Sequence, residues 1–153
     1  MKTFNTTLQE VMYFVLDEWA MMLADPDEAA EVSFDPESIY YVVIATYHGV
    51  FDGTLSIIAQ NGFIELLTDN LLGIDPGEGL SQEDKLDALK ELANVVSGNF
   101  LVEAFGKETV FELPSFESFC VEPQDIHKFL NDDFVYCVGD EQVVALDFNI
   151  RSD

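Results

Sequence analysis

Apolar residues near the N-terminus recur every three or four positions, which is the spacing of an amphipathic helix. They are Leu8, Val11, Met12, Val15, Leu16, Trp19, Met22 and Leu23. Asn5 or Thr6 is predicted to cap this helix. The segment Ala24-Asp25-Pro26-Asp27 is predicted to end it, because the residue before a proline disfavours helical angles.

Two segments rich in β-branched and aromatic residues follow, at residues 39–47 and 54–59. Because a short connection with glycine at positions 49 and 53 joins them, they predict a β-hairpin. Residues 63–71 then show helical spacing and predict a second, shorter helix that Gly73 ends.

A polar turn at residues 75–79 precedes Ser81, whose hydroxyl is predicted to cap a third helix running to about Gly106. The acidic residues Glu83 and Asp84 suit the positive N-terminal end of that helix.

The C-terminal region is predicted to form short elements. They are strands at 109–113 and 118–121, a helical turn over 125–130 started by Pro123, and a hairpin of 134–138 and 142–148 around Gly139-Asp140. No linker or repeat divides the chain, so residues 1–153 are expected to form a single α+β domain, a mostly antiparallel sheet packed by helices.

Composition and charge exclude some classes of function. The 153 residues are 48% hydrophobic and carry a net charge of −24, so the chain has apolar surface to bury and repels nucleic acids and anionic membranes. The charge need not reflect a particular function, because solubility or adaptation to a salty cell interior also explains it. The longest apolar run, residues 39–45, is too short to span a bilayer, and no signal peptide is visible, so a cytoplasmic protein is expected.

Several kinds of site find no support. The glycine pattern of nucleotide-binding loops is missing. Zinc bound by Cys120, His127, Cys137 and His48 is disfavoured, because their spacings match no paired ligand motif. The two cysteines form no disulfide framework and are expected to be buried thiols, and no metal site is predicted in this chain.

The third helix is the informative segment. At about 100° per residue, one stripe is predicted to face the core. It consists of Leu86, Leu89, Ala93, Val96 and Phe100. Asp87, Glu91, Asn94 and Gly98 then lie together on the outward side, with Val95 at its flank. Polar residues are common on exposed helix faces and need no function to be there. A mid-helix glycine costs about 1 kcal/mol relative to alanine, so Gly98 indicates either a partner's backbone pressing on this side or a local bend or neighbouring loop.

The run Asp87-Ala-Leu-Lys-Glu91-Leu-Ala-Asn94-Val-Val-Ser-Gly98-Asn99 resembles the signature of the CheC/CheX family of chemotaxis phosphatases, an acid or serine, a glutamate and an asparagine on one exposed helix. With the similar segments at 49–58 and 63–73, the resemblance covers about residues 38–104. Because the first helix carries no Glu-x-x-Asn, the chain resembles the single-site CheX branch.

The resemblance implies a CheX-like fold and hydrolysis of the aspartyl phosphate on the receiver domain of a response regulator such as CheY. Asn94 would hold the attacking water and Glu91 would pair with the receiver's lysine, while Asp87, Val95 and Gly98 would contact the partner. This chain would bind no cofactor, since the receiver supplies Mg²⁺. Family members pair, so a homodimer is expected. Two other hypotheses remain. One is a catalytically inactive module that binds a receiver or another signalling protein. The other is a structural domain with no receiver partner, which would be favoured if the outward strip from residue 87 to residue 98 were buried.

Overall fold

The computed structural model describes residues 2–20, 22, 37–72, 81–108, 111–112, 114–130, 134–139 and 142–151. Within them the chain forms a five-stranded antiparallel sheet with the strand order β3-β1-β2-β5-β4. The strands are β1 (Tyr40–Tyr47), β2 (Asp52–Gln60), β3 (Ser115–Val121), β4 (Val135–Gly139) and β5 (Gln142–Arg151). The predicted α+β fold with an antiparallel sheet is confirmed.

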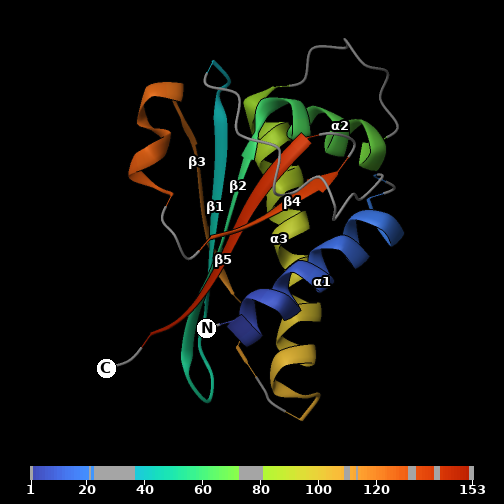
Figure 1. The fold of residues 1–153 in the computed structure, drawn as a ribbon, viewed down its shortest axis with the longest axis vertical. Coiled ribbons are helices and arrows are strands. Elements are labelled where there is room, and N and C mark those ends of the chain that lie inside the picture. The colour runs from blue at the N-terminus through green and yellow to red at the C-terminus, as the bar shows by residue number, and fades with distance from the viewer. Residues whose placement is uncertain are drawn as a thin grey trace.

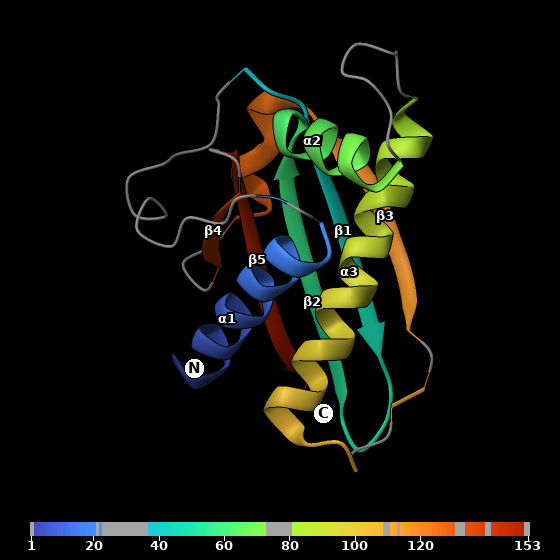
Figure 2. The same ribbon diagram turned by 90° about the vertical axis from the view of Figure 1, so that its right-hand side faces the viewer.

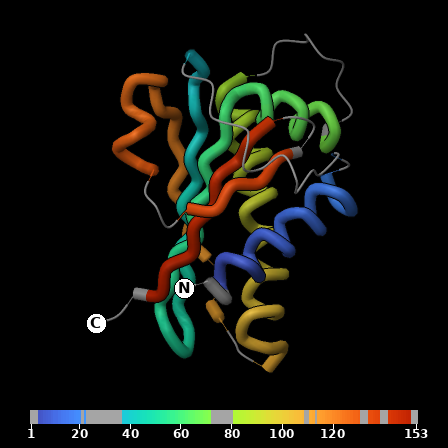
Figure 3. The backbone as a smooth tube through the Cα atoms, viewed as in Figure 1, coloured from blue at the N-terminus to red at the C-terminus, as the bar shows by residue number. Residues whose placement is uncertain are grey.

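Three α-helices cover one face of the sheet (Figures 1 and 2). They are α1 (Lys2–Glu18), α2 (Asn61–Leu72) and α3 (Gln82–Phe105). Helix α1 packs beside α3 and over strands β4 and β5, while α3 lies over β1 and β2. A short 3-10 helix, η2 (Pro123–Lys128), lies on the opposite side of the sheet from α1, as the backbone trace in Figure 3 shows.

Both predicted hairpins are present. Strand β1 pairs with β2 from Tyr40↔Gln60 to Tyr47↔Gly53, and β4 pairs with β5 up to Gly139↔Gln142. The two hairpins meet where β2 pairs with β5, a contact between distant parts of the chain. Strands β3 and β4, both from the C-terminal region, therefore form the two edges of the sheet.

Side chains of β1 alternate between two hydrophobic cores, as the two-residue period of a strand requires. Tyr41, Val43 and Ala45 face the helices and belong to the larger core, while Tyr40 and Val42 belong to a smaller core on the side of η2. The larger core holds α3 against the middle of the sheet, which determines the side of α3 that remains outside.

The predicted first helix is displaced toward the N-terminus. It begins at Lys2 and so runs through Asn5 and Thr6, which do not cap it. The ring of Phe4 packs 6.3 Å from Phe100 and 5.3 Å from Phe105, measured between centroids, and this burial extends the helix backwards.

The same helix also ends earlier than predicted, at Glu18. The amides of Trp19 and Ala20 both donate to the carbonyl of Val15, and the amide of Met22 donates to that of Leu16, so the chain leaves the helix while its apolar spacing continues. Met22 is still buried, but it lies in the turn that follows the helix and not in the helix itself. Leu23 and the predicted stop at residues 24–27 lie outside the described residues.

The C-terminal region differs in detail. Strand β3 begins at Ser115, before the predicted start at 118, and the predicted helical turn is η2. Of the predicted strand at 109–113, residues 109, 110 and 113 lie outside the described residues. Phe111 forms an isolated bridge with Gly49, beside a 2.7 Å hydrogen bond from the Glu112 amide to the His48 carbonyl. The predicted turn at 75–79, Gly73 and Asp140 lie outside the described residues.

Candidate functional site

Helix α3 has well-defined ends. The hydroxyl of Ser81 accepts a 3.1 Å hydrogen bond from the amide of Asp84, which is the predicted N-cap, and acidic Glu83 and Asp84 occupy the first turn. At the other end Gly106 has a φ of +92° and donates its amide to the carbonyl of Val102. Glycine easily adopts the positive φ that commonly follows the end of a helix. The predicted end of the third helix at about Gly106 is therefore confirmed.

The inward side of α3 is wider than the predicted stripe. Leu89, Ala93, Val96 and Phe100 are fully buried, whereas Leu86 is only partly buried. Four further residues of α3, outside the predicted stripe, are also buried: Ala88, Leu92, Ser97 and Leu101. Because α1, α2 and the sheet contact α3 from three directions, more than one stripe is enclosed.

The outward side carries the predicted residues. Asp87, Glu91, Asn94 and Gly98 are all exposed, and we call these four the α3 strip. Asp87 lies 4.0 Å from the ammonium of Lys90, whereas within the described residues no hydrogen bond or ion pair engages the side chains of Glu91 or Asn94. Both polar groups are therefore available to a ligand, and the burial that would favour a structural domain with no receiver partner is not observed at these four residues.

Gly98 lies in open space. A Cβ atom built on it meets no described atom within 4 Å, and α3 continues as an α-helix through this position. A neighbouring loop in the described chain therefore does not account for the glycine. The absence of such a contact favours the other explanation of Gly98, which is the approach of a second protein.

Two hollows lie on the α1 side of α3. One, of about 380 Å³, adjoins the strip and is lined by Trp19 and Leu71 together with Asp87 and Glu91. The other, of about 270 Å³, lies farther along α3 and is lined by Phe14, Asn99 and Glu103 among others. Neither aromatic residue was predicted from the sequence to be part of a site. The sequence does contain a signal that Phe14 is exposed, because this apolar residue lies on the side of the first helix that also carries Glu10 and Asp17.

The four zinc-ligand candidates are not brought together. Cys120 lies on β3 and Cys137 on β4, at opposite edges of the sheet. His48 hydrogen-bonds Asp52 at 3.0 Å, and His127 is on η2. Among the described residues no three histidine, cysteine, aspartate or glutamate side chains converge to hold a metal ion.

Cys137 is fully buried, and this burial raises the pKa of its thiol to about 12. Cys120 is half-buried, and burial together with the negative charge of Glu122 raises its pKa as well. A cysteine nucleophile needs a lowered thiol pKa, so neither residue has the character of one.

In the part of the chain that the structure describes, no helix is long and apolar enough to cross a membrane.

A family model described as "Chemotaxis phosphatase CheX" matches residues 41–118, which run from the second residue of β1 through β2, α2 and the whole of α3 into β3. No curated protein sequence gives a significant match.

Solved structures with the same fold match almost the whole chain. CheX from Desulfovibrio desulfuricans has a TM-score of 0.66 at 12% identity, covering 97% of this chain and 99% of its own. A CheC-like superfamily protein from Shewanella sp. PV-4 has a TM-score of 0.60 at 17% identity, covering 97% of both chains. CheX in a CheX–CheY–BeF₃–Mg²⁺ complex from Borrelia burgdorferi has a TM-score of 0.59 at 16% identity, covering 99% of this chain and 97% of the other.

The chain thus shares its fold with these CheX and CheC-like structures. The family model matches more than half of the chain, and the chain belongs to the CheX family of chemotaxis phosphatases.

Proposed function

We propose that this protein hydrolyses the aspartyl phosphate of a CheY-like receiver domain. The observation that carries the proposal is the pair Glu91 and Asn94, exposed on one side of α3 and without a partner in the described chain. Their spacing of three residues brings both side chains to one patch of surface, where a second protein can meet them together.

The chemistry requires little from this chain. An aspartyl phosphate is hydrolysed by a water aligned with the phosphorus, and the receiver contributes the Mg²⁺ and a lysine. The carboxamide of Asn94 can both donate a hydrogen bond to that water and accept one from it, and so hold it in line. The carboxylate of Glu91 pairs with the receiver's lysine and orients the complex, and Asp87, Val95 and Gly98 contribute contact surface.

The partner is proposed from the family. The Borrelia burgdorferi CheX of the same fold has been solved in complex with CheY, BeF₃ and Mg²⁺. That complex supports a receiver domain as the partner of this chain. The open space around Gly98 supports it independently, since a partner's backbone can approach α3 there.

The test is a phosphate-release assay. Receiver domains are phosphorylated with acetyl phosphate and Mg²⁺, and the loss of acid-labile phosphate is followed with and without this protein. Asn94→Ala is expected to reduce the rate on the order of 10²-fold or more while receiver binding persists, because only the positioning of water is lost. Glu91→Ala is expected to weaken binding as well as rate.

Gln82→Ala serves as the matched control, because it removes an exposed carboxamide from the first turn of the same helix. It is expected to leave the rate unchanged. If Asn94→Ala retains full activity, the proposed mechanism is wrong. If the wild-type protein binds a receiver without hydrolysing its phosphate, the protein is the inactive binding module instead.

A further inference from the structure

Helix α1, which packs beside the helix that carries the proposed site, presents an aromatic side chain to solvent. Phe14 is 58% exposed, the largest exposed fraction among the described aromatic residues. The inward side of α1 is complete without it, since Val11, Met12, Val15 and Leu16 are buried in the larger core. The exposure of Phe14 is therefore not explained by the packing of α1.

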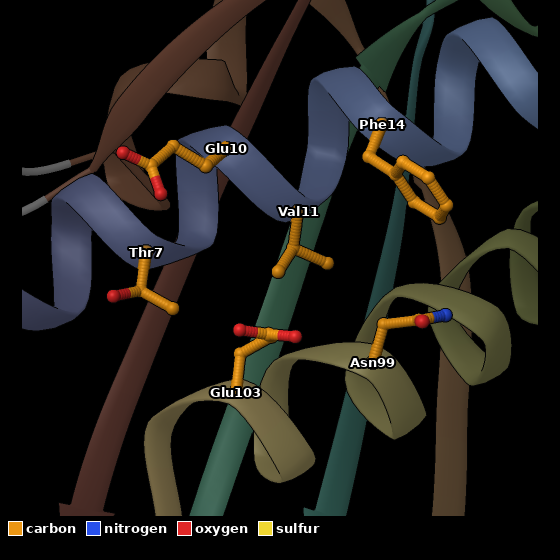
Figure 4. Close-up of a pocket in the computed structure, with 6 residues that line it drawn as sticks. All are labelled: Thr7, Glu10, Val11, Phe14, Asn99 and Glu103. Atoms are coloured by element: carbon orange, nitrogen blue, oxygen red, sulfur yellow. The ribbon is translucent and has the colours of Figure 1, made fainter.

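Phe14 lies at the edge of a hollow between α1 and α3. Figure 4 shows its ring and the Glu103 side chain reaching into the gap between the helices, the former from α1 and the latter from α3. Val11 and the exposed Glu10 line the α1 side, and Asn99 lines the α3 side (Figure 4). The hollow, of about 270 Å³, thus combines an apolar wall with carboxylates from both helices.

An apolar border on α3 separates the hollow from the α3 strip. Asn99 follows Gly98 directly, and its side-chain amide donates a 2.8 Å hydrogen bond to the carbonyl of Val95, which keeps it against its own helix. In helical projection, half-buried Val95 and exposed Val102 fall between the strip and the hollow. A protein docked on Asn94 and Gly98 therefore meets this apolar border and the hollow next.

The charge of the hollow specifies what fills it. Its described lining includes Glu10 and Glu103 but no lysine or arginine, and the whole chain has only six basic residues. A partner residue in the hollow has to be positively charged near the carboxylates and apolar near Phe14. Lysine and arginine meet both requirements, because each joins a cationic head to an aliphatic stem.

We infer that this hollow is a second contact of the receiver-docking surface and accepts a lysine or arginine side chain of the receiver domain. The stem packs against Phe14 and Val11, and the cation lies between Glu10 and Glu103. This inference rests on the proposed function, and it makes α1 the element that selects among receiver domains. It also accounts for binding by a chain of net charge −24 to a partner with an acidic phosphorylation site, since the attraction comes from a basic rim outside that site.

The test separates docking from catalysis. The steady-state KM and kcat are measured with a phosphorylated receiver domain that the wild-type protein dephosphorylates, and the Kd for the same receiver with beryllofluoride and Mg²⁺ is measured in parallel. Phe14→Ala is expected to raise KM and Kd about tenfold, with kcat within about twofold of wild type. Glu103→Lys is expected to raise them similarly at low salt and by less at about 0.5 M NaCl, where charges are screened.

Matched controls lie away from the helical face. Phe129→Ala removes a partly exposed phenylalanine that follows η2, and Glu117→Lys reverses an exposed charge on β3. Both are expected to leave KM and Kd unchanged. Thermal melts establish that each variant is folded, and Glu103→Lys tests the hollow independently of Phe14.

An unchanged KM in both Phe14→Ala and Glu103→Lys would overturn the inference while leaving the proposed function in place, and so would a fall in kcat alone. If the wild-type protein binds a receiver but does not hydrolyse its phosphate, Kd replaces KM and the same comparison decides. A wild-type protein that neither binds nor dephosphorylates any receiver would overturn the proposed function and this inference together.

Discussion

At the scale of single residues, Gly98 is the feature that favours the proposed docking surface over an ordinary polar helix face. Asp87, Glu91 and Asn94 belong to residue types that any solvent-exposed helix carries, so their exposure alone says little. A glycine in the same row weakens the helix, and within the described chain no neighbouring atom makes use of the space it leaves. The advantage of the glycine is therefore expected in a complex.

Substitutions at Gly98 follow from this. Gly98→Ala is expected to raise the free energy of unfolding by up to about 1 kcal/mol, because alanine favours the helix and its Cβ meets nothing. Gly98→Gln is also expected to fold normally, but its side chain keeps the receiver's backbone away and removes most of the phosphatase activity. Thermal melts and phosphate release on the same two variants check this. Early unfolding of both variants would instead assign Gly98 to internal packing.

The buried thiol of Cys137 makes a second prediction at this scale. Burial raises its pKa from an ordinary value of 9.0 to about 12 in the folded protein, so the neutral thiol stabilises the fold fully below pH 9. That stabilisation is lost as the pH rises toward 12. Urea unfolding at pH 7 and above pH 9 is expected to show a smaller alkaline loss in Cys137→Ala than in the wild type. An equal loss in both would contradict it.

At the scale of elements, α3 carries the site because its two sides have different roles. Leu89, Val96 and Phe100 hold it against the sheet, and this anchoring turns Glu91 and Asn94 outward. Its first turn is further held by Lys85, whose ammonium donates a 3.0 Å hydrogen bond to Asn61 at the start of α2. The position of the strip is thus set by the packing of α3 against β1, β2 and α2.

The N-cap of α3 is expected to affect stability but not docking. Ser81→Ala removes the acceptor for the amide of Asp84, and the free energy of unfolding is expected to fall by about 1 kcal/mol. Ser81→Asp keeps an acceptor at this position and is expected to retain most of the stability. Chemical denaturation measures both, and KM for the receiver should stay at the wild-type value. A raised KM in Ser81→Ala would mean that fraying of the first turn reaches the strip.

At the scale of the whole molecule, the sheet ends in two edge strands, β3 and β4. An edge strand can continue its sheet into a second copy, and the family resemblance predicts a homodimer. The charge of −24 opposes association, because two copies repel each other strongly at low salt.

The protein is therefore expected to be dimeric at tens of micromolar, with a dissociation constant that decreases as NaCl screens the charge. Light scattering at about 50 mM and 500 mM NaCl measures the mass. A monomer at both salt concentrations would contradict the prediction. A dimer that weakens with salt would contradict the role given to the charge.

Sequence alone determined the features that depend on local rules. The period of 3.6 residues identified α3 and its exposed row, Ser81 and Gly106 marked its ends, and β-branched runs around tight connections identified both hairpins. These signals are local because caps, turns and amphipathic spacing act over a few residues. The resemblance around Glu91 and Asn94 lies within one such helix, and for that reason it was visible in the sequence.

Tertiary structure alone decided the rest. The pairing of β2 with β5, which gives β3 and β4 the edges, joins distant segments and leaves no local signal. The start of α1 lies before Asn5 and Thr6 because Phe4 packs against distant Phe100 and Phe105, contacts that outweigh the capping preference of those two residues. Phe14 became part of a surface only when α1 packed beside α3, since the hollow that it lines has one wall on each helix.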